Sequence, residues 1–232
     1  MTARPPNDSI RVIVPMTGDE ALPPGEFFEK VLGAGEGVEL VVAADLSLPE
    51  SSRRALEARG ATVHPGEGPR GARLSQAASR AQAGILVFLH ADTLLPKGWR
   101  PLVEEAIEKG AVGGAFRLGF EGSGGRMAFV AFWANLRTAL TRVPYGDQAP
   151  FVRREVYEKL GGHRPWPLLD DLELGRRLKR SGRVMILPAK VRTSPRRYLE
   201  KGVARTVLRN WRILLRYHGG ESPEKLAELY RR

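Results

Sequence analysis

The sequence predicts an α/β protein whose sheet is mainly parallel. Short apolar runs alternate with helical patterns four times within about ninety residues, which is typical of right-handed βαβ crossovers. The run at 85–89 is rich in branched and aromatic side chains, follows Gly84 and is too short for a helix, so it indicates a strand buried on both faces. In such sheets ligands bind beyond the carboxyl ends of the strands.

The predicted elements are regular in the first half of the chain and less regular in the second. In the first half we expect strands at 11–14, 37–47, 61–66 and 85–89, and helices at 26–35, 49–60 and 70–84. In the second half we expect helices at 99–110, 127–136, 167–183 and 202–217, a glycine-containing strand at 111–120 and a further strand at 184–188. The stretch 143–162 is expected to form a loop, a short strand and a helix. A last helix opens at Ser222, a suitable N-cap, with Pro223 in the first turn.

The composition favours an anionic partner. The 37 lysines and arginines outnumber the 26 aspartates and glutamates, and the formal net charge is +11. Such a balance suits a phosphorylated small molecule, nucleic acid or a membrane surface, although a surface rich in arginine is the simpler alternative. The absence of cysteine excludes disulfides, thiol catalysis and thiolate metal sites. The first ten residues lack the apolar core of a signal peptide, so we expect a cytoplasmic protein.

Acidic residues fall at loop positions of this scheme: Asp45, Asp92 and the pair Asp170 and Asp171. Carboxylates at strand ends suit a hard divalent cation, because Mg²⁺ takes one or two carboxylates together with substrate phosphate oxygens and water. Asp92 could equally cap its own turn. Asp170 and Asp171 precede a helix, where an acid stabilises the helix dipole by roughly 0.3–1 kcal/mol. One cap needs one acid, so the doubled pair indicates a second role.

The start of the alanine-rich helix carries a candidate anion site. Arg70 and Arg73 stand in its first turn, where free backbone N–H groups and guanidinium groups both attract anions. Gly66, Gly68 and Gly71 would let the backbone approach a phosphate, but their spacing matches neither the Walker nor the Rossmann fingerprint. The pattern therefore predicts an anion site without naming the anion.

Five stretches of the sequence together resemble a known family. They are RVIVPMTGDE, LVVAADLS, RGARLSQAASRAQAGILVFLHADTLLPKGW, YGDQAPFVRREVYEKLGG and PLLDDLELGRRLKRSGR. Their order is that of a family 2 glycosyltransferase with the GT-A fold, and the variant resembles the small bacterial subgroup labelled arsenosugar-biosynthesis or radical-SAM/selenodomain-associated glycosyltransferases. The resemblance implies a three-layer α/β/α fold with a mainly parallel mixed sheet and C-terminal helices. It divides the chain into a flexible tail (1–10), a catalytic domain (11–200) and a helical appendage of that domain (201–232).

The resemblance implies a role for each of these residues. Asp45 would contact the base or ribose of a nucleotide-sugar donor. Asp92 corresponds to the last acid of the Asp-x-Asp motif, which binds a divalent metal, Mg²⁺ or Mn²⁺, bridging the donor diphosphate. His90 replaces the first acid of that motif and is the second candidate metal ligand. Asp171 matches the general base of inverting relatives, and Asp170 stands where Glu is usual.

Further site residues follow from the same resemblance. The implied nucleotide-sugar site comprises Pro15, Glu20, Asp45, Arg70, Arg73, Ala91 and Asp92. The loop beside the donor sugar and acceptor comprises Tyr145, Gly146, Asp147 and Gln148. Transfer with inversion needs a base at the acceptor hydroxyl and stabilisation of the leaving diphosphate. The implied partners are a nucleotide-diphosphate sugar and a small-molecule or lipid-linked acceptor, with no nucleic acid.

Three other functions compete with this interpretation. A nucleotidyltransferase would also use a metal held by acids, but it carries a glycine-rich basic loop after the first strand, which PMTGDE is not. A nucleic-acid-binding module would interleave aromatics with basic residues on one face or show a known signature. A non-catalytic nucleotide-binding or sugar-binding protein is the third alternative, because His90 replaces an acid.

The basic helix at 202–217 suggests a membrane contact. We expect its apolar stripe to pack on the catalytic domain and its arginines to face solvent. The stripe comprises Val203, Val207, Trp211, Leu214 and Leu215, and the arginines are Arg205, Arg209, Arg212 and Arg216. This arrangement predicts weak, salt-sensitive contact with an anionic membrane surface at the inner face of the membrane, without insertion of Trp211.

Overall fold

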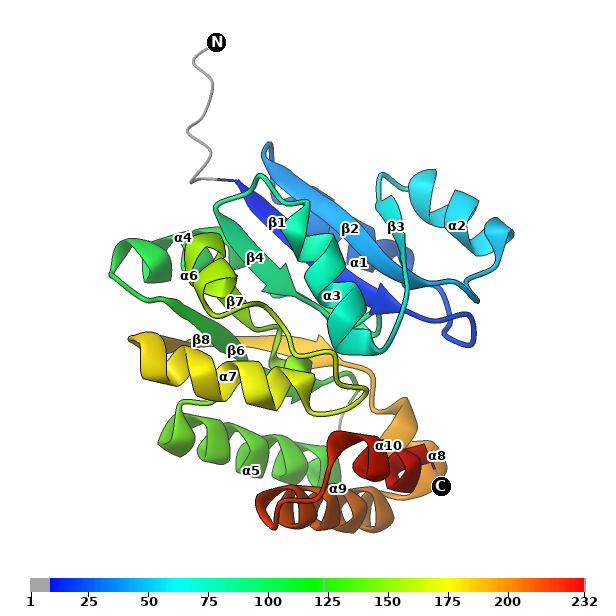
Figure 1. Ribbon diagram of the computed structural model, residues 1–232, viewed down its shortest axis with the longest axis vertical. Helices are drawn as coiled ribbons and strands as arrows, with labels where there is room; N and C mark the ends of the chain where they lie inside the picture. Colours follow the sequence, from blue (N-terminus) through cyan, green and yellow to red (C-terminus); the bar gives the residue numbers. More distant parts are fainter. Residues whose placement is uncertain (1–8, 123, 232) are drawn as a thin grey trace.

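The computed structural model describes residues 9–122 and 124–231 and contains one mixed sheet with helices on both faces (Figure 1). The strands are β1 (Ile10–Met16), β2 (Val38–Asp45), β3 (Thr62–Gly66), β4 (Ile85–Phe88), β5 (Thr93–Leu94), β6 (Gly113–Phe120), β7 (Phe151–Arg153) and β8 (Val184–Thr193). The helices are α1 (Gly25–Leu32), α2 (Glu50–Glu57), α3 (Arg70–Ser79), α4 (Trp99–Glu108), α5 (Gly125–Thr141), α6 (Arg154–Lys159), α7 (Asp170–Ser181), α8 (Arg196–Lys201), α9 (Val203–His218) and α10 (Pro223–Arg231), with a short 3₁₀ helix η2 (Gly146–Gln148).

The sheet joins a parallel half to a mixed half. Its strand order is β3-β2-β1-β4-β7-β6-β8-β5. The strands β3, β2, β1 and β4 are parallel, with Val12 paired to Leu40 on one side and to Val87 on the other. The strand β7 runs antiparallel to both β4 and β6, and β6 is parallel to β8. The predicted α/β class with a mainly parallel mixed sheet is confirmed.

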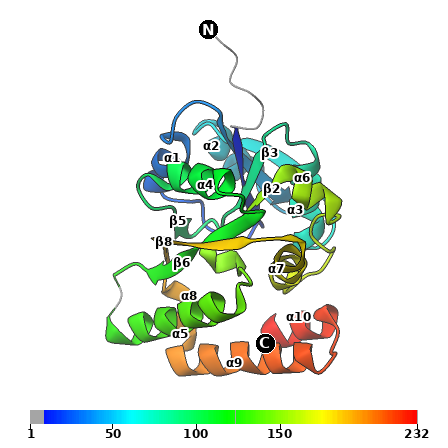
Figure 2. The ribbon, with the colours of Figure 1, turned by 90° about the vertical axis from the view of Figure 1, so that its left-hand side faces the viewer.

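The central strands are apolar throughout because the sheet is covered on both faces. Neighbouring residues of a strand point to opposite faces, and Val12 and Ile13 accordingly belong to two different clusters of buried side chains. One cluster includes Phe27 of α1 and Trp99 of α4, and the other includes Leu74 of α3 together with residues of α7. Figure 2 shows α1 and α4 on one side of the sheet and α3 and α7 on the other.

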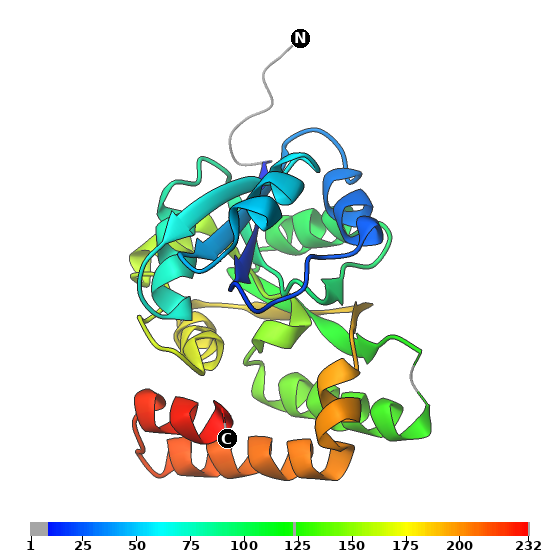
Figure 3. The same ribbon diagram turned by 90° about the vertical axis from the view of Figure 1, so that its right-hand side faces the viewer.

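The element boundaries differ from the predictions mainly in the second half. The strand β1 begins at Ile10, which is buried, so the predicted tail ends at least one residue earlier; residues 1–8 of that tail lie outside the described part. The strand β8 continues to Thr193, five residues beyond the predicted end, because its second part pairs with β5 and β6. The two-residue strand β5 carries too little sequence signal to be predicted. The C-terminal region forms α8, α9 and α10, which pack beneath the sheet (Figure 3).

The orientation of α9 differs from the prediction. Its buried residues are Thr206 and Ile213, whereas Trp211 is 59% exposed and Leu215 is 66% exposed. The guanidinium of Arg209 lies 4.4 Å from the ring centroid of Tyr230 on α10, so this arginine is turned toward the protein. The stacked arginine holds part of the basic stripe inward, and the expectation that Trp211 and Leu215 pack on the domain is therefore wrong.

Candidate active site

The candidate site lies beyond the carboxyl ends of the parallel strands. His90 and Asp92 follow β4, Asp45 ends β2, and the first loop follows β1 at Met16. The second half of the chain adds the 3₁₀ helix η2 and the N-terminus of α7, where Asp170 and Asp171 are the first two residues. The topology therefore brings together residues more than 150 positions apart, and most of the predicted site residues meet at this edge.

Arg70, the first residue of α3, contacts both the start of α7 and the turn after β4. Its Nη1 lies 2.7 Å from each carboxylate oxygen of Asp170, and its Nη2 lies 3.1 Å from His90 Nε2. Because a guanidinium only donates, His90 Nε2 accepts, and the proton of the neutral imidazole is on Nδ1. Burial, together with the Arg70 charge, lowers the pKa of His90 to about 4. His90 is thus a neutral side chain at physiological pH.

Asp170 and Asp171 have different surroundings. The side chain of Asp170 is buried and paired with Arg70, and burial raises the pKa of Asp170 although the Arg70 charge opposes this. Asp171 is half-buried and turns the other way: its Oδ2 accepts the Gly146 N–H at 2.5 Å and its Oδ1 accepts the Leu172 N–H at 2.8 Å. Each oxygen retains a further lone pair. The second acid of the pair is therefore the one whose carboxylate keeps acceptor capacity at this edge of the sheet.

Gly146 and the backbone before α7 allow these groups to come close. A Cβ on Gly146 would lie 2.8 Å from both Asp171 Oδ2 and His90 Nε2, so any side chain there would displace one of these two groups. Leu169, directly before the acid pair, has a φ of 62°, in the left-handed region that non-glycine residues rarely adopt. Such strain is found where the surrounding structure fixes a functional loop.

Three other residues of the predicted sugar loop, Tyr145, Asp147 and Gln148, have different surroundings. Gln148 is buried, and its Oε1 accepts the Thr138 hydroxyl at 2.8 Å, which ties the loop to α5. The Arg137 guanidinium lies 3.5 Å from the ring centroid of Tyr145. Asp147 Oδ1 is buried with no hydrogen-bond partner among the described residues. Burial raises the pKa of Asp147 to about 6, against the opposing charge of Arg137.

The ends of β1 and β2 are joined by Asp45 and Arg73, two residues of the predicted nucleotide-sugar site. Asp45 Oδ1 accepts the Ser47 N–H at 2.6 Å, and hydrogen bonding from Ser47 lowers the pKa of Asp45. Arg73 is buried, and its Nη1 donates to the Met16 carbonyl at 3.0 Å and lies 3.4 Å from Asp45 Oδ2. Arg73 therefore joins the ends of β1 and β2, while Arg70 serves the opposite side of the site.

The first loop places its two predicted residues differently. Pro15 is buried inside β1, paired with Ala43, so its side chain belongs to the sheet. The Glu20 carboxylate accepts the Thr17 N–H at 2.9 Å, and burial raises the pKa of Glu20. The Asp92 charge also acts on Glu20, so the first loop lies on the Asp92 side of the site.

The predicted metal ligands provide only part of a metal site. Asp92 is exposed, with one short-range contact at 3.3 Å from the Thr93 hydroxyl to Oδ1, and half-buried Ala91 stands between it and His90 in the turn after β4. His90 presents Nε2 to Arg70, which leaves Nδ1 as its other nitrogen. Among the residues described by the structure, no group of three or more His, Cys, Asp or Glu is placed to hold a metal ion. The donor set fits a hard cation that takes one carboxylate and completes its shell with substrate phosphate and water.

Three residues near the site were missed by sequence reasoning. Arg137 acts on Asp147, Tyr198 of α8 lies near enough to feel the Asp147 charge, and Arg197 acts on His90. Burial raises the pKa of Tyr198 to about 12, and Asp147 adds to the effect. For Arg137 the one available signal was its place directly after the apolar run at 127–136. No sequence pattern pointed to Arg197 or Tyr198.

Comparison with solved structures identifies the fold. No family model and no curated protein matches the chain. TarS of S. aureus (residues 1–349) shares the fold with a TM-score of 0.59 and 14% identity, over 83% of this chain and 62% of that one. Its complex with UDP gives a TM-score of 0.57. The mannosyltransferase PcManGT from Pyrobaculum calidifontis, in complex with GDP-Man and Mn²⁺, gives 0.57 and 22% identity, over 82% of this chain and 57% of that one.

These likenesses establish a GT-A-type glycosyltransferase fold. The chain spans less than two thirds of the length of TarS (1–349) and of PcManGT. Within the described residues, no helix is both long enough and apolar enough to cross a membrane.

Proposed function

We propose that this protein transfers a sugar from a nucleotide-diphosphate sugar to an acceptor hydroxyl, as a family 2-like hexosyltransferase acting with inversion. The observation that carries the proposal is the position of Asp171. Its carboxylate is fixed by two backbone N–H groups on the edge of the sheet that also carries His90, Arg70 and Asp92. PcManGT, which has the same fold, was solved with a nucleotide sugar and a divalent metal.

The mechanism needs a base on one side of the sugar and charge stabilisation on the other. Asp171 would accept the proton of the acceptor hydroxyl while the hydroxyl oxygen forms its bond to the anomeric carbon and the bond to the diphosphate breaks. The Arg70 guanidinium and the Nδ1–H of neutral His90 are donors suited to phosphate oxygens. Asp170, buried against Arg70, would hold that guanidinium in place.

A divalent cation, Mg²⁺ or Mn²⁺, would be held by Asp92 together with the donor diphosphate, and it would neutralise charge on the leaving group. His90 could ligate the cation through Nδ1 only if its proton moved to Nε2 and the Arg70 contact at that atom were lost, so the arrangement favours Asp92 as the protein ligand. On the nucleotide side, Asp45 and Arg73 would form the cradle for ribose and base, with Glu20 and Ala91 at its edge.

The partners proposed from the sequence are kept: a nucleotide-diphosphate sugar as donor, a small molecule or lipid-linked molecule as acceptor, and no nucleic acid. We place the protein in the cytoplasm. The charge at the site supports a phosphorylated donor, because Arg70 and Arg73 flank it from two sides.

A calorimetric titration of UDP-sugars and GDP-sugars, with and without Mn²⁺, tests the proposal. We expect one base to bind in the micromolar range or tighter, and we expect Asp92→Asn to weaken binding roughly a hundredfold with Mn²⁺ present, since a carboxylate–cation contact is worth several kcal/mol. Without Mn²⁺ the wild type and the variant should bind alike. Equal affinity of both proteins in Mn²⁺ would return Asp92 to the turn-capping role, and failure of every nucleotide to bind would remove the proposal.

A further inference from the structure

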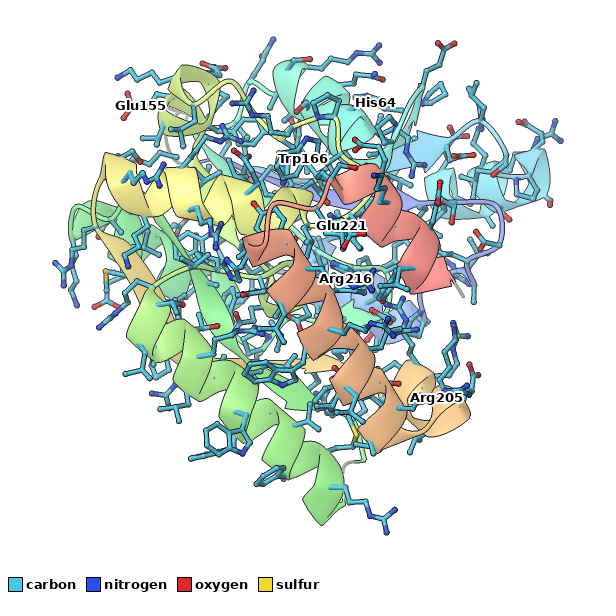
Figure 4. All side chains as sticks on the ribbon, turned by 60° about the horizontal axis from the view of Figure 1, so that its bottom comes forward. His64, Glu155, Trp166, Arg205, Arg216 and Glu221 are labelled. Atoms are coloured by element: carbon cyan, nitrogen blue, oxygen red, sulfur yellow. The ribbon has the colours of Figure 1, made fainter. Side chains whose placement is uncertain are left out.

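Two neighbouring helices, α5 and α9, expose several large apolar side chains. These two helices contact each other and lie side by side in Figure 4, where Arg205 and Arg216 are labelled. Their exposed apolar residues, each 52–75% accessible, are Phe129, Phe132, Trp133, Leu140, Leu208, Trp211 and Leu215. Outside these two helices the described large hydrophobics exposed to a comparable degree are Leu46 and Leu199. Isolated exposed hydrophobics are ordinary, but such a concentration marks an interaction surface.

The spacing of these residues gives each helix one apolar stripe. On α9 the exposed residues Leu208, Trp211 and Leu215 follow at three and four positions, the period of one helix face. On α5 the Trp133 ring makes edge contacts with Phe129 at 6.1 Å and Phe132 at 5.7 Å between centroids. The opposite sides of the helices pack on the protein through Met127, Ala131 and Ile213. The exposed apolar stripes therefore take no part in packing these helices on the rest of the protein.

The charge of the two helices is of one sign. Together they contain six arginines and no aspartate or glutamate: Arg126, Arg137, Arg205, Arg209, Arg212 and Arg216. Arg126, Arg205 and Arg212 are exposed on these helices. Amphipathic helices with arginine beside Trp, Phe and Leu lie in the plane of a membrane interface, with the aromatic rings at headgroup depth and the guanidinium groups on lipid phosphates.

We propose that the α5–α9 face docks on an anionic lipid bilayer, with Trp133 and Trp211 inserted into the interface. A second copy of the chain fits this face poorly, because a twofold contact would set arginines against arginines with no acid on either helix. A nucleic acid would leave Leu140, Leu208 and Leu215 without a partner. The proposal replaces the expectation that Trp211 stays out of the membrane.

The docked orientation would bring the candidate site to the membrane. On α5, Arg137 lies between Trp133 and Leu140 in sequence and stacks on Tyr145. Tyr198, whose pKa reflects the Asp147 charge, stands on α8, directly before α9. A bilayer held by α5 and α9 would therefore lie next to the acceptor side, which suits a lipid-linked acceptor. The docking itself does not depend on glycosyl transfer.

Vesicle flotation of the full chain, without donor or metal, tests the proposal. Phosphatidylglycerol vesicles should bind the protein at low salt, and phosphatidylcholine vesicles should bind it weakly. The double variant Trp133→Gln/Trp211→Gln should weaken binding by roughly tenfold or more, because burying one large apolar side chain is worth at least a tenfold step. Leu208→Gln should also weaken binding, whereas Leu46→Gln, equally exposed on the loop after β2, should not.

The charge contribution has its own matched pair. Arg205→Gln/Arg212→Gln should reduce affinity by roughly thirtyfold at low salt, since each arginine near an anionic surface contributes about 1 kcal/mol. Arg54→Gln/Arg80→Gln removes the same charge from α2 and from the turn after α3 and should have little effect. Brominated lipid should quench the fluorescence of Trp133 and Trp211.

Three results would overturn the proposal: vesicle binding unchanged by the tryptophan variants, absence of quenching, or no binding at all. Sedimentation without lipid should show a monomer. A dimer that Leu208→Gln dissociates would instead assign the face to a second copy. Because none of these measurements involves a donor, they can fail while the nucleotide titration succeeds, and the reverse.

Discussion

Two acids on opposite sides of the candidate site, Asp45 and Asp147, differ in their hydrogen bonding and in the direction of their pKa shifts. On the proposed nucleotide side, Asp45 is bound by Ser47 and lies 3.4 Å from Arg73, and its pKa is lowered. On the proposed acceptor side, Asp147 has one buried oxygen without a partner among the described residues, and its pKa is raised to about 6. The Asp45 carboxylate at the end of β2 is thus satisfied by its partners, although Arg73 Nε beside it is buried without a partner among the described residues, while the loop at η2 holds charge at a free-energy cost.

Under the proposed function, this difference would separate the residues that bind the donor from those that take part in the chemistry. A cradle that is already hydrogen-bonded can hold a ligand without rearrangement. Groups whose charge is poorly satisfied are the ones whose protonation a substrate can change, and perturbed carboxyl groups gather at functional sites for this reason. Asp171 lies between these extremes, since its oxygens are oriented by backbone N–H groups but retain acceptor capacity.

The largest expected effect separates the two neighbouring acids. Asp171→Asn should reduce turnover by a factor on the order of 10²–10⁴, the usual contribution of a positioned base, with donor affinity nearly unchanged. Asp170→Asn should instead reduce the free energy of unfolding by about 3–5 kcal/mol, because it leaves the Arg70 charge without its buried partner. Single-turnover kinetics and urea unfolding of both variants measure the two effects.

The same pair of variants can contradict the assignment. If Asp171→Asn lowers donor affinity while turnover of the bound donor is unchanged, Asp171 belongs to the donor site. If Asp170→Asn retains its stability and loses turnover, the roles of the two acids are exchanged.

The fold was largely predictable, and the reason is local. In the first half each strand is a short apolar run and each helix has its own period, so the βαβ order follows from nearest neighbours in the sequence. The residues of β5, β7 and the second part of β8 have little periodicity, and their pairing depends on contacts that are distant in the chain. The orientation of α9 depends on Arg209 stacking on Tyr230, a contact between helices that no pattern within α9 reveals.

The site was predictable where residues follow strands and less so elsewhere. The positions of Asp45, His90 and Asp92 follow from strand ends, and Asp171 from the doubled acid at a helix start. The different contacts of Arg70 and Arg73 could not be inferred from the sequence. Although they lie in the same turn of α3, Arg70 contacts His90 after β4, whereas Arg73 contacts Met16 at the end of β1. The contributions of Arg137 and Tyr198 required the packing of α5 and α8 beneath the sheet.

The second prediction concerns Asp147 and the pH dependence of stability. Because the pKa of its folded form is raised to about 6 from 3.8, the folded state binds the proton more tightly, and stability falls as pH rises from about 4 through 6. Asp147→Asn imitates the protonated side chain at every pH. It should raise the free energy of unfolding by up to about 3 kcal/mol above pH 7 and have little effect below pH 4.

Urea unfolding at pH 4 and pH 7.5 measures this effect. The groups that act on Asp147 are Arg137, Asp171, Asp92 and Tyr198, and Arg137→Gln should increase the penalty at pH 7.5 by removing the one favourable charge. An equal gain from Asp147→Asn at both pH values would mean that packing, and not titration, determines the effect.

The smallest expected effect is the opposite slope at Asp45. Its pKa is lowered by Ser47, so its contribution to stability is present above the ordinary Asp value of 3.8 and is lost as pH falls through the lower folded value. Asp45→Asn keeps an oxygen for the Ser47 N–H and loses only the charge. With the Asp45 side chain 34% exposed, solvent screening limits the loss to about 0.5 kcal/mol at neutral pH, and the difference should vanish in acid. The same urea series measures it, with Asp19→Asn on the exposed first loop as a control for general charge.

Asp45→Asn and Asp147→Asn should therefore change stability at pH 7.5 with opposite signs and converge on the wild type in acid. If both variants were stabilised at neutral pH, the Asp45 carboxylate would be as strained as that of Asp147, and the contrast between a satisfied and a strained acid would fail.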